Sequence, residues 1–213
     1  RLITEEDLRK RLDGRRVALV AHPASVTAGL VHSLDALVAR EVNVTSAFGP
    51  QHGLKGDKQD NMVESEDYLD PVHKIPVFSL YGEHRRPTDE MLASFDHLLF
   101  DLQDLGCRIY TYISTLKYFL EACAKNGKSI WVLDRPNPAG RPIDGMRLLA
   151  GQESFVGSDE LTMIDDLFSR DTQRDMGQPY TRSRYYHLYI NGQYWGIYQT
   201  QERSEAAYGA SYF

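Results

Sequence analysis

The run Val17-Ala18-Leu19-Val20-Ala21 is the feature of this chain that most limits the folds open to it. A strand with one face in solvent alternates polar and apolar residues, whereas an unbroken apolar run of this length is typical of a parallel strand covered on both faces. Neighbouring parallel strands need a long crossover connection, which is usually a helix. The run therefore predicts a sheet with helices on both sides.

The residues that follow repeat the same alternation of strand and helix. Strands are expected near 42–48, 75–80, 97–101 and 129–133, and helices near 34–40, after Pro87-Thr88, and over about 111–125. Before the first strand, Thr4 precedes three acidic residues and predicts a helix start in which Thr4 is the cap. This order favours right-handed βαβ units and a mostly parallel, doubly wound sheet of the α/β class.

The pattern of predicted strands and helices changes after Gly145. Ser158 and Glu160 are followed by apolar residues at helical spacing, namely Leu161, Ile164, Leu167 and Phe168. Two strand-like runs, Arg184 to Ile190 and Gln193 to Thr200, flank Asn191-Gly192, a strong hairpin signal because both turn residues need positive φ. We therefore expect two domains, an α/β domain over residues 1–148 and a small helix plus β-hairpin segment over residues 149–213.

Charge and hydrophobicity argue against two classes of partner. The formal net charge is -6, and no cluster of Lys and Arg gathers enough charge for a nucleic-acid footprint. The apolar runs are far shorter than the roughly 20 residues that a membrane-spanning helix needs. We expect no nucleic-acid partner and no membrane span.

A metal centre is not expected either. Cys107 and Cys123 are the two cysteines, and they fall in different predicted elements, so they form neither a CxxC pair nor a zinc knuckle. His22, His52, Asp101 and Asp134 would all lie at strand ends, but they lack the HxxxH or HxH spacing of a metal site. No metal and no cofactor is predicted.

Three polar loops follow predicted strands and predict a shared site. They are Gly49-Pro50-Gln51-His52-Gly53, Asp101-Leu102-Gln103-Asp104-Leu105-Gly106 and Asp134-Arg135-Pro136-Asn137-Pro138. In doubly wound sheets ligands bind beyond the carboxyl ends of the strands. We expect these loops to meet at one edge of the sheet and form one pocket.

These loops also carry a resemblance to a known family. Residues 16–145 resemble the NamZ-type exo-β-N-acetylmuramidases in a series of ordered motifs: His22-Pro23, Phe48 to Gly53, Ser79-Leu80-Tyr81-Gly82, Arg86-Pro87-Thr88, Phe100 to Gly106, Tyr110-Thr111-Tyr112 and Leu133 to Pro138. The resemblance implies a Rossmann-like domain that forms one wall of a sugar-binding cleft, truncated relative to the family. It implies a small carbohydrate or peptidoglycan fragment as partner, and it favours an extracytoplasmic or cell-envelope location; the oligomeric state is not implied.

The implied chemistry, glycoside hydrolysis, uses a proton-donating acid and an ionised carboxylate. The family commonly has Glu where this chain has Gln51, and an amide neither gives nor takes a proton at neutral pH. The remaining catalytic candidates are His52, Asp101, Asp104 and Glu121. Each has a structural alternative: His52 would bond its own loop, Asp101 would cap a turn, Asp104 would pair with Arg108, and Glu121 would face solvent beside Lys125.

Substrate contacts are expected from the same motifs. A guanidinium fork suits a carboxylate, so Arg135 would grip the lactyl carboxylate of muramic acid, unless it forms an internal ion pair with Asp134 or Asp101. Gln51 would orient substrate by hydrogen bonds. The other expected contacts are Gln103, Tyr110 and Asn137.

The tail resembles a second family. Phe168-Ser169-Arg170-Asp171-Thr172-Gln173 and the stretch from His187 to Tyr198, ending in Glu202-Arg203, resemble part of the CotH protein kinases. Three functions thus remain open at this point. They are a glycosidase domain acting on N-acetylmuramic acid ends, a catalytically silent carbohydrate-binding module, and a fragment of a CotH-like kinase, the last disfavoured because the tail has no lysine to hold a nucleotide.

Overall fold

The computed structural model of the chain describes residues 1–56, 64–105, 110–135, 151 and 153–155, together with the backbone of residues 183–190 and 193–201. The chain divides into two compact units. One contains the large sheet and its helices, and the other contains a hairpin. The domain boundary predicted at residue 148 lies outside the described residues and stays a prediction.

The first unit is built on a six-stranded sheet with the spatial order β3-β4-β2-β1-β5-β6. Its strands are β1 (Val17–Ala21), β2 (Val44–Gly49), β3 (Tyr68–Leu69), β4 (Pro76–Ser79), β5 (His97–Asp101) and β6 (Ser129–Val132). The pairs from β4 to β6 are parallel, and β3 alone joins the edge antiparallel. The chain winds outward from β1 in both directions, so the predicted doubly wound α/β sheet is confirmed.

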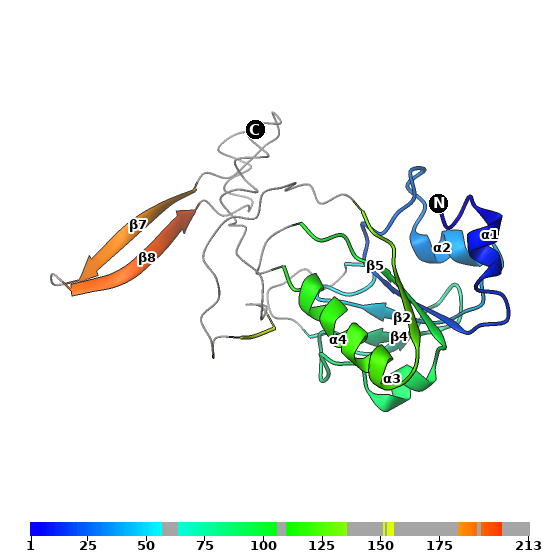
Figure 1. Cartoon of the computed structure of the whole chain (residues 1–213). Coiled ribbons are helices and arrows are strands. Elements are labelled where there is room, and N and C mark those ends of the chain that lie inside the picture. The colour runs from blue at the N-terminus through cyan, green and yellow to red at the C-terminus, as the bar shows by residue number, and fades with distance from the viewer. Residues whose placement is uncertain are drawn as a thin grey trace. The chain divides into compact units, whose positions relative to one another are not determined.

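Helices cover both faces of this sheet, as Figure 1 shows. The helices are α1 (Glu6–Lys10), α2 (Ser33–Val38), α3 (Asp89–Ala93) and α4 (Tyr112–Lys125). The core on one face contains Leu34 and Leu37 of α2, and the core on the other contains Phe119 and Cys123 of α4. The helices α2, α3 and α4 lie in the connections β1–β2, β4–β5 and β5–β6, as the alternating sequence pattern predicts, whereas the described part of the β2–β4 connection contains β3.

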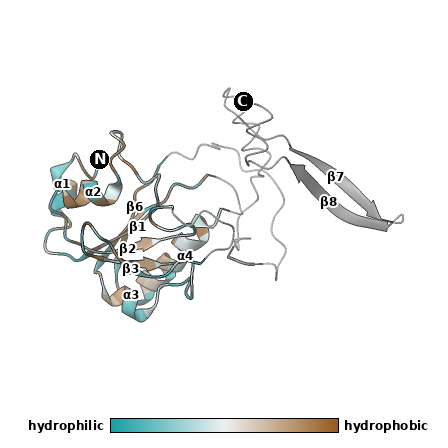
Figure 2. Cartoon of the chain, turned by 180° about the vertical axis from the view of Figure 1, so that it is seen from behind, coloured by the Kyte–Doolittle hydropathy of each residue, from teal (hydrophilic) through white to brown (hydrophobic). Residues whose placement is uncertain are grey.

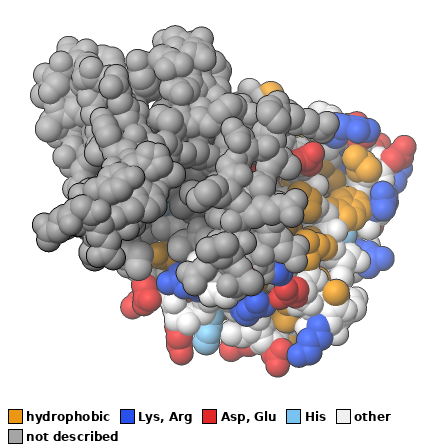
Figure 3. Space-filling model, turned by 60° about the vertical axis from the view of Figure 1, so that its left-hand side comes forward, with side chains coloured by type: hydrophobic (Ala, Val, Ile, Leu, Met, Phe, Trp, Pro, Cys, Tyr) orange, Lys and Arg blue, Asp and Glu red, His pale blue; other side chains and the backbone are white. Residues whose placement is uncertain are grey.

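The central strands explain why the sheet is stable. All five residues of β1 and all five of β5 are buried, and they alternate between the two cores. Figure 2 shows brown, hydrophobic residues around the labelled strands β1 and β2 and hydrophilic residues on the outer side of α1. On the face that Figure 3 shows, acidic and basic side chains are interspersed among the described residues. Among those residues, no helix is long and apolar enough to cross a membrane.

Two local details differ from the sequence expectations. Thr4 was expected to cap α1, but Glu5 occupies the cap position without a side-chain bond, and Thr4 Oγ1 instead donates to the carbonyl of Arg1 at 3.1 Å. The strand β3 was not predicted, because it has only two residues and both are exposed.

The second unit contains an antiparallel hairpin of β7 (Ser183–Ile190) and β8 (Gln193–Gln201). The predicted hairpin around Asn191-Gly192 is confirmed in its strands, although the two turn residues themselves lie outside the described residues. The helix predicted after Ser158 also lies outside them.

Candidate functional site

The carboxyl ends of four parallel strands define the site. β2, β1, β5 and β6 are neighbours in this order, so the loops that follow them leave from one edge of the sheet. The loops after β5 and β6 are joined by hydrogen bonds, directly and through the loop after β1, whereas the loop after β2 is bonded to Thr111 before α4. The prediction that the three loops leave from one edge of the sheet is confirmed. The single pocket expected from them is not found in the part of the chain that the structure describes, because the hollow beside Asp101 and Arg135 is lined by neither the loop after β2 nor Gln103 and Asp104.

Asp101 and Arg135 form the centre of the edge. Arg135 donates from Nε to one carboxylate oxygen of Asp101 at 2.8 Å and from Nη2 to the other at 2.9 Å. The Asp101 side chain is 1% exposed, and that of Arg135 is 29% exposed. Hydrogen bonding to Asp101 raises the pKa of Arg135 above its usual value. A buried carboxylate held by both arms of a guanidinium is a strong structural link between β5 and the loop after β6.

The loop after β1 is tied to the same pair. Ser33 donates its hydroxyl to the carboxylate of Asp101, and Ser25 donates its hydroxyl to the Asp101 backbone carbonyl. The third nitrogen of Arg135, Nη1, donates to the carbonyl of Val26 at 2.9 Å. The alternative of an internal ion pair with Asp101 is therefore the arrangement found, and the Arg135 fork is already occupied.

The loop after β2 is held against the start of α4. Thr111, the residue before α4, donates its hydroxyl to Oε1 of Gln51 at 3.2 Å. Gly49 precedes this turn, and a Cβ atom there would lie 2.6 Å from the backbone nitrogen of Leu54. Only glycine allows this close approach. Because Oε1 of Gln51 accepts from Thr111, its amide nitrogen is the group of this side chain that could donate to a ligand.

His52 occupies the apex of that turn in a costly conformation. Its φ is +72°, in the left-handed region that residues with a Cβ rarely adopt, and Gly53 follows with a φ of +80°. The His52 side chain is exposed. A histidine held exposed in such a backbone is a candidate for a functional role, because strain of this kind persists where the surroundings impose it.

His22, directly after β1, belongs to a family motif but was not among the site residues predicted from the sequence. Its Nδ1 accepts a hydrogen bond from the backbone of Ala24 at 2.9 Å, so the neutral ring carries its proton on Nε2. Burial lowers the pKa of His22. The ring lies 5.0 Å from that of Tyr112, whose hydroxyl is hydrogen bonded to Tyr110. His22 is thus a neutral donor at the end of β1, the strand that lies between β2 and β5.

The remaining predicted residues fall in three groups. Gln103 and Asp104 lie just after β5 and are partly buried at the edge. Burial raises the pKa of Tyr110, and the charge of Asp104 adds to this effect. Glu121 lies ten residues after Thr111 along α4, roughly 15 Å at the helical rise. Asn137 lies outside the described residues. The structure therefore brings Gln103, Asp104 and Tyr110 to the edge but not Glu121.

Glu121 has a structural partner of its own. Arg86 donates to its carboxylate at 2.6 Å, and Lys117 lies 3.9 Å away, so the neighbour expected from the sequence, Lys125, is not its ion-pair partner. The hydrogen bond from Arg86 lowers the pKa of Glu121. An ionised, exposed carboxylate in this position is a surface ion pair beside Tyr118, over which Arg86 stacks.

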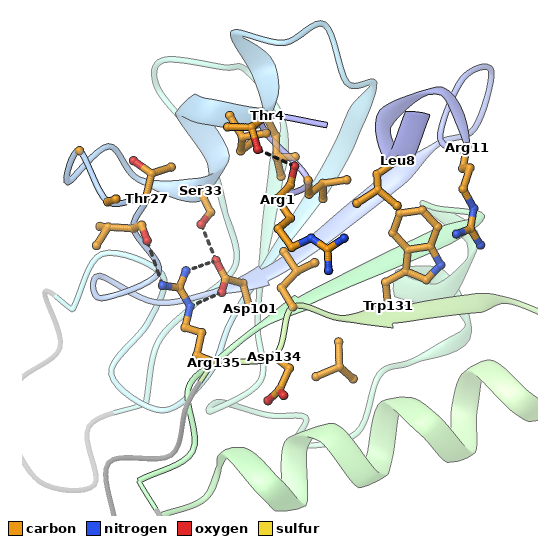
Figure 4. Close-up of a pocket in the computed structure, with 18 of the residues that line it drawn as sticks. Arg1, Thr4, Leu8, Arg11, Thr27, Ser33, Asp101, Trp131, Asp134 and Arg135 are labelled. Atoms are coloured by element: carbon orange, nitrogen blue, oxygen red, sulfur yellow. Dashed lines mark hydrogen bonds and ion pairs between the residues drawn. The ribbon is translucent and has the colours of Figure 1, made fainter. Parts of the chain in front are cut away.

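A hollow of about 1070 Å³ opens beside the Asp101–Arg135 pair. Figure 4 shows Asp101, Asp134, Arg135, Ser33 and Trp131 around it, with Arg1 and Leu8 from the N-terminal segment. This volume matches that of small-molecule sites, which hold about 300 to 1,000 Å³. The hollow was not predicted, because it depends on the N-terminal segment lying along β6. No group of three metal-binding side chains occurs among the described residues.

The fold and the edge together define a Rossmann-like α/β domain with a carboxyl-edge site. The model of the family "Exo-beta-N-acetylmuramidase NamZ, N-terminal" matches residues 17–169, and this chain belongs to that family. It is 45% identical over 153 residues to the peptidoglycan beta-N-acetylmuramidase NamZ of Bacillus subtilis (strain 168). This match covers 71% of the chain but 37% of that relative, so the chain spans a little over a third of its length.

Solved structures agree with the fold. Two DUF1343 family proteins from Bacteroides fragilis share 42% and 31% sequence identity with the chain, at TM-scores of 0.65 and 0.61. Each match covers 73% of this chain and 39% of the solved one. Residues 145–211 match the model of the CotH kinase protein family, which agrees with the resemblance of the tail over a short stretch.

Proposed function

We propose that the chain forms the substrate-binding wall of a glycosidase that acts on N-acetylmuramic acid ends of peptidoglycan fragments. The observation that carries this proposal is that residues of several family motifs lie at one edge of the sheet. There Thr111 donates a hydrogen bond to Gln51, and Arg135 donates one to Asp101. Membership of the family supports the proposal, as does the peptidoglycan activity named for the Bacillus subtilis relative.

In this proposal some residues position the site and others take part in the reaction. Asp101 is buried and shared among three donated hydrogen bonds, so it acts with Arg135 as a positioning residue. Asp104, which is partly exposed at the edge, supplies the carboxylate of the reaction. The exposed imidazole of His52 acts as the general acid that transfers the proton. Glu121 takes no part, because Arg86 holds it along the helix and away from the edge.

Substrate would be held by donors that the fold leaves at this edge. The amide nitrogen of Gln51 and Nε2 of His22 are suited to hydroxyl and acetamido oxygens, and Tyr110 and Gln103 lie beside them. With the Arg135 fork occupied by Asp101, the lactyl carboxylate would meet the outer side of that guanidinium rather than a free fork.

The test is the release of a chromogenic group from a muramic acid β-glycoside by the full chain. Release is expected, with a large loss in Asp104→Asn and none in Glu121→Gln, which is the matched control. The corresponding N-acetylglucosamine glycoside, which lacks the lactyl group, should react more slowly. Saturable binding of N-acetylmuramic acid without any release, unchanged in Gln51→Glu, would overturn the glycosidase proposal and leave a binding module.

A further inference from the structure

A second hollow lies at the opposite edge of the sheet. It has a volume of about 320 Å³ and is lined by Arg11, Arg15, His97, Ser129 and Trp131. His97 and Ser129 begin β5 and β6 and are paired across these strands. The hollow therefore opens at the amino ends of β5 and β6. It shares Arg11 and Trp131 with the larger hollow, but nothing in the proposed function uses it.

Two guanidinium groups at this hollow have no acidic partner among the described residues. Arg11 lies 4.7 Å from the centre of the Trp131 ring, a cation–π contact that leaves its N–H groups open to an anion. Neither Arg11 nor Arg15 forms an ion pair with a described carboxylate, whereas the adjacent Arg16 is held by Asp96 at 2.6 Å. The chain as a whole is negatively charged, with a formal net charge of -6, whereas this hollow carries two positive charges without a described acidic partner.

His97 adds an unsatisfied polar atom to the same place. Its side chain belongs to a residue that is 3% exposed, and its Nε2 has no hydrogen-bond partner in the described part of the chain. Buried polar atoms without a partner are rare and call for an explanation. The ring stands edge-on to Trp131, with the ring centres 4.6 Å apart. The imidazole of His97 thus forms a polar part of the wall beside the two arginines.

We propose that this hollow binds a phosphate group. Two guanidinium groups and the hydroxyl of Ser129 line the hollow beside the imidazole of His97, and a set of several donors suits the oxygens of a tetrahedral oxyanion. A planar carboxylate would satisfy one fork and leave the other donors unused. The half-buried face of Trp131 offers an apolar wall for an organic group attached to the phosphate.

Calorimetry with inorganic phosphate at constant ionic strength tests the proposal on the full chain. Saturable binding is expected, weakened about tenfold or more in Arg11→Gln/Arg15→Gln, because each charge-assisted hydrogen bond contributes about a factor of ten. Arg40→Gln removes another exposed arginine and is the matched control. Lactate, a planar carboxylate, should bind at least about tenfold more weakly.

A second measurement locates the phosphate. The imidazole resonances of His97 should shift as phosphate is added and should not shift in the double arginine variant. Ser129→Ala, which leaves every charge in place, should weaken binding by a smaller factor. No saturable binding, equal losses in Arg40→Gln, equal affinity for lactate, or unmoved His97 resonances would each overturn the phosphate site.

Discussion

Arg135 holds both carboxylate oxygens of Asp101, through Nε at 2.8 Å and Nη2 at 2.9 Å, and joins residues that are 34 positions apart in the chain. This pair links the loop after β6 to the end of β5, and the same aspartate is bonded by Ser25 of the loop after β1 and by Ser33, the first residue of α2. The edge is therefore organised around a structural ion pair rather than around a free catalytic acid.

Arg135→Gln should destabilise the chain by about 3 kcal/mol, because removing one partner leaves a buried carboxylate without its counter-charge. The free energy of unfolding in urea gives the measurement. The double variant Asp101→Asn/Arg135→Gln should recover part of the loss, since no unpaired charge remains. A double variant less stable than Arg135→Gln alone would contradict the importance of the pair.

Gly49→Ala should cost about 2 kcal/mol of stability, since the added Cβ would lie 2.6 Å from the backbone nitrogen of Leu54. Gly29→Ala is the control, because its Cβ would meet only Thr27 Oγ1, at 3.8 Å. Thermal unfolding of the two variants compares them directly. Equal melting temperatures would show that the turn before Gln51 relaxes more easily than its geometry suggests.

His52→Gly and His52→Ala separate strain from function. Both remove the imidazole, but only glycine accepts the φ of +72° without a steric penalty, so the Gly variant should be more stable than the Ala variant by about 1 kcal/mol. Both should lose activity to the same extent if the imidazole handles the proton. Full activity in either variant would remove His52 from the mechanism.

Acidification should destabilise the fold through His97. Burial, with smaller effects of Arg15 and Arg11, lowers its pKa in the folded chain to about 4, against about 6.5 in an unfolded chain. Between these pH values His97 is protonated in the unfolded chain but neutral in the folded chain. The free energy of unfolding therefore decreases as the pH falls from 6.5 toward 4, by about 3 kcal/mol at most. The buried His22, with its lowered pKa, contributes in the same direction.

The variant His97→Phe keeps a ring against Trp131 and removes this titration. Urea unfolding at pH 7 and pH 4.5 should then show a smaller loss in the variant than in the unchanged chain. Equal losses would place the acid sensitivity in other groups.

The sequence predicts the fold well because the strands that decide it are buried on both faces. Val17 to Ala21 and His97 to Asp101 are continuous apolar or strand-forming runs, and the structure places strands over those same residues. Thr4 does not cap α1 because residues 1–5 form a turn of their own, in which the backbone and the hydroxyl of Thr4 donate to the carbonyl of Arg1.

The site was predicted only in part, because its contacts depend on which loops become neighbours. From the sequence, Arg135 could bind either the substrate or an internal acidic partner. Because β5 and β6 are neighbours in the sheet, Arg135 lies beside Asp101 and pairs with it. His22 gained its place from the central position of β1 in the sheet. Glu121 is not part of the site, because its position along α4 is distant from the carboxyl edge. It pairs with Arg86 there.

The most direct test of the account is a map of the surface that binds N-acetylmuramic acid, from amide shifts of the full chain during titration with the sugar. The account predicts that the perturbed amides cluster at the carboxyl edge, in Gly49–Gly53, Leu102–Asp104 and Leu133–Arg135, and that N-acetylglucosamine perturbs them less. Perturbations gathered at the amino ends of the strands, or none at saturating sugar, would contradict it.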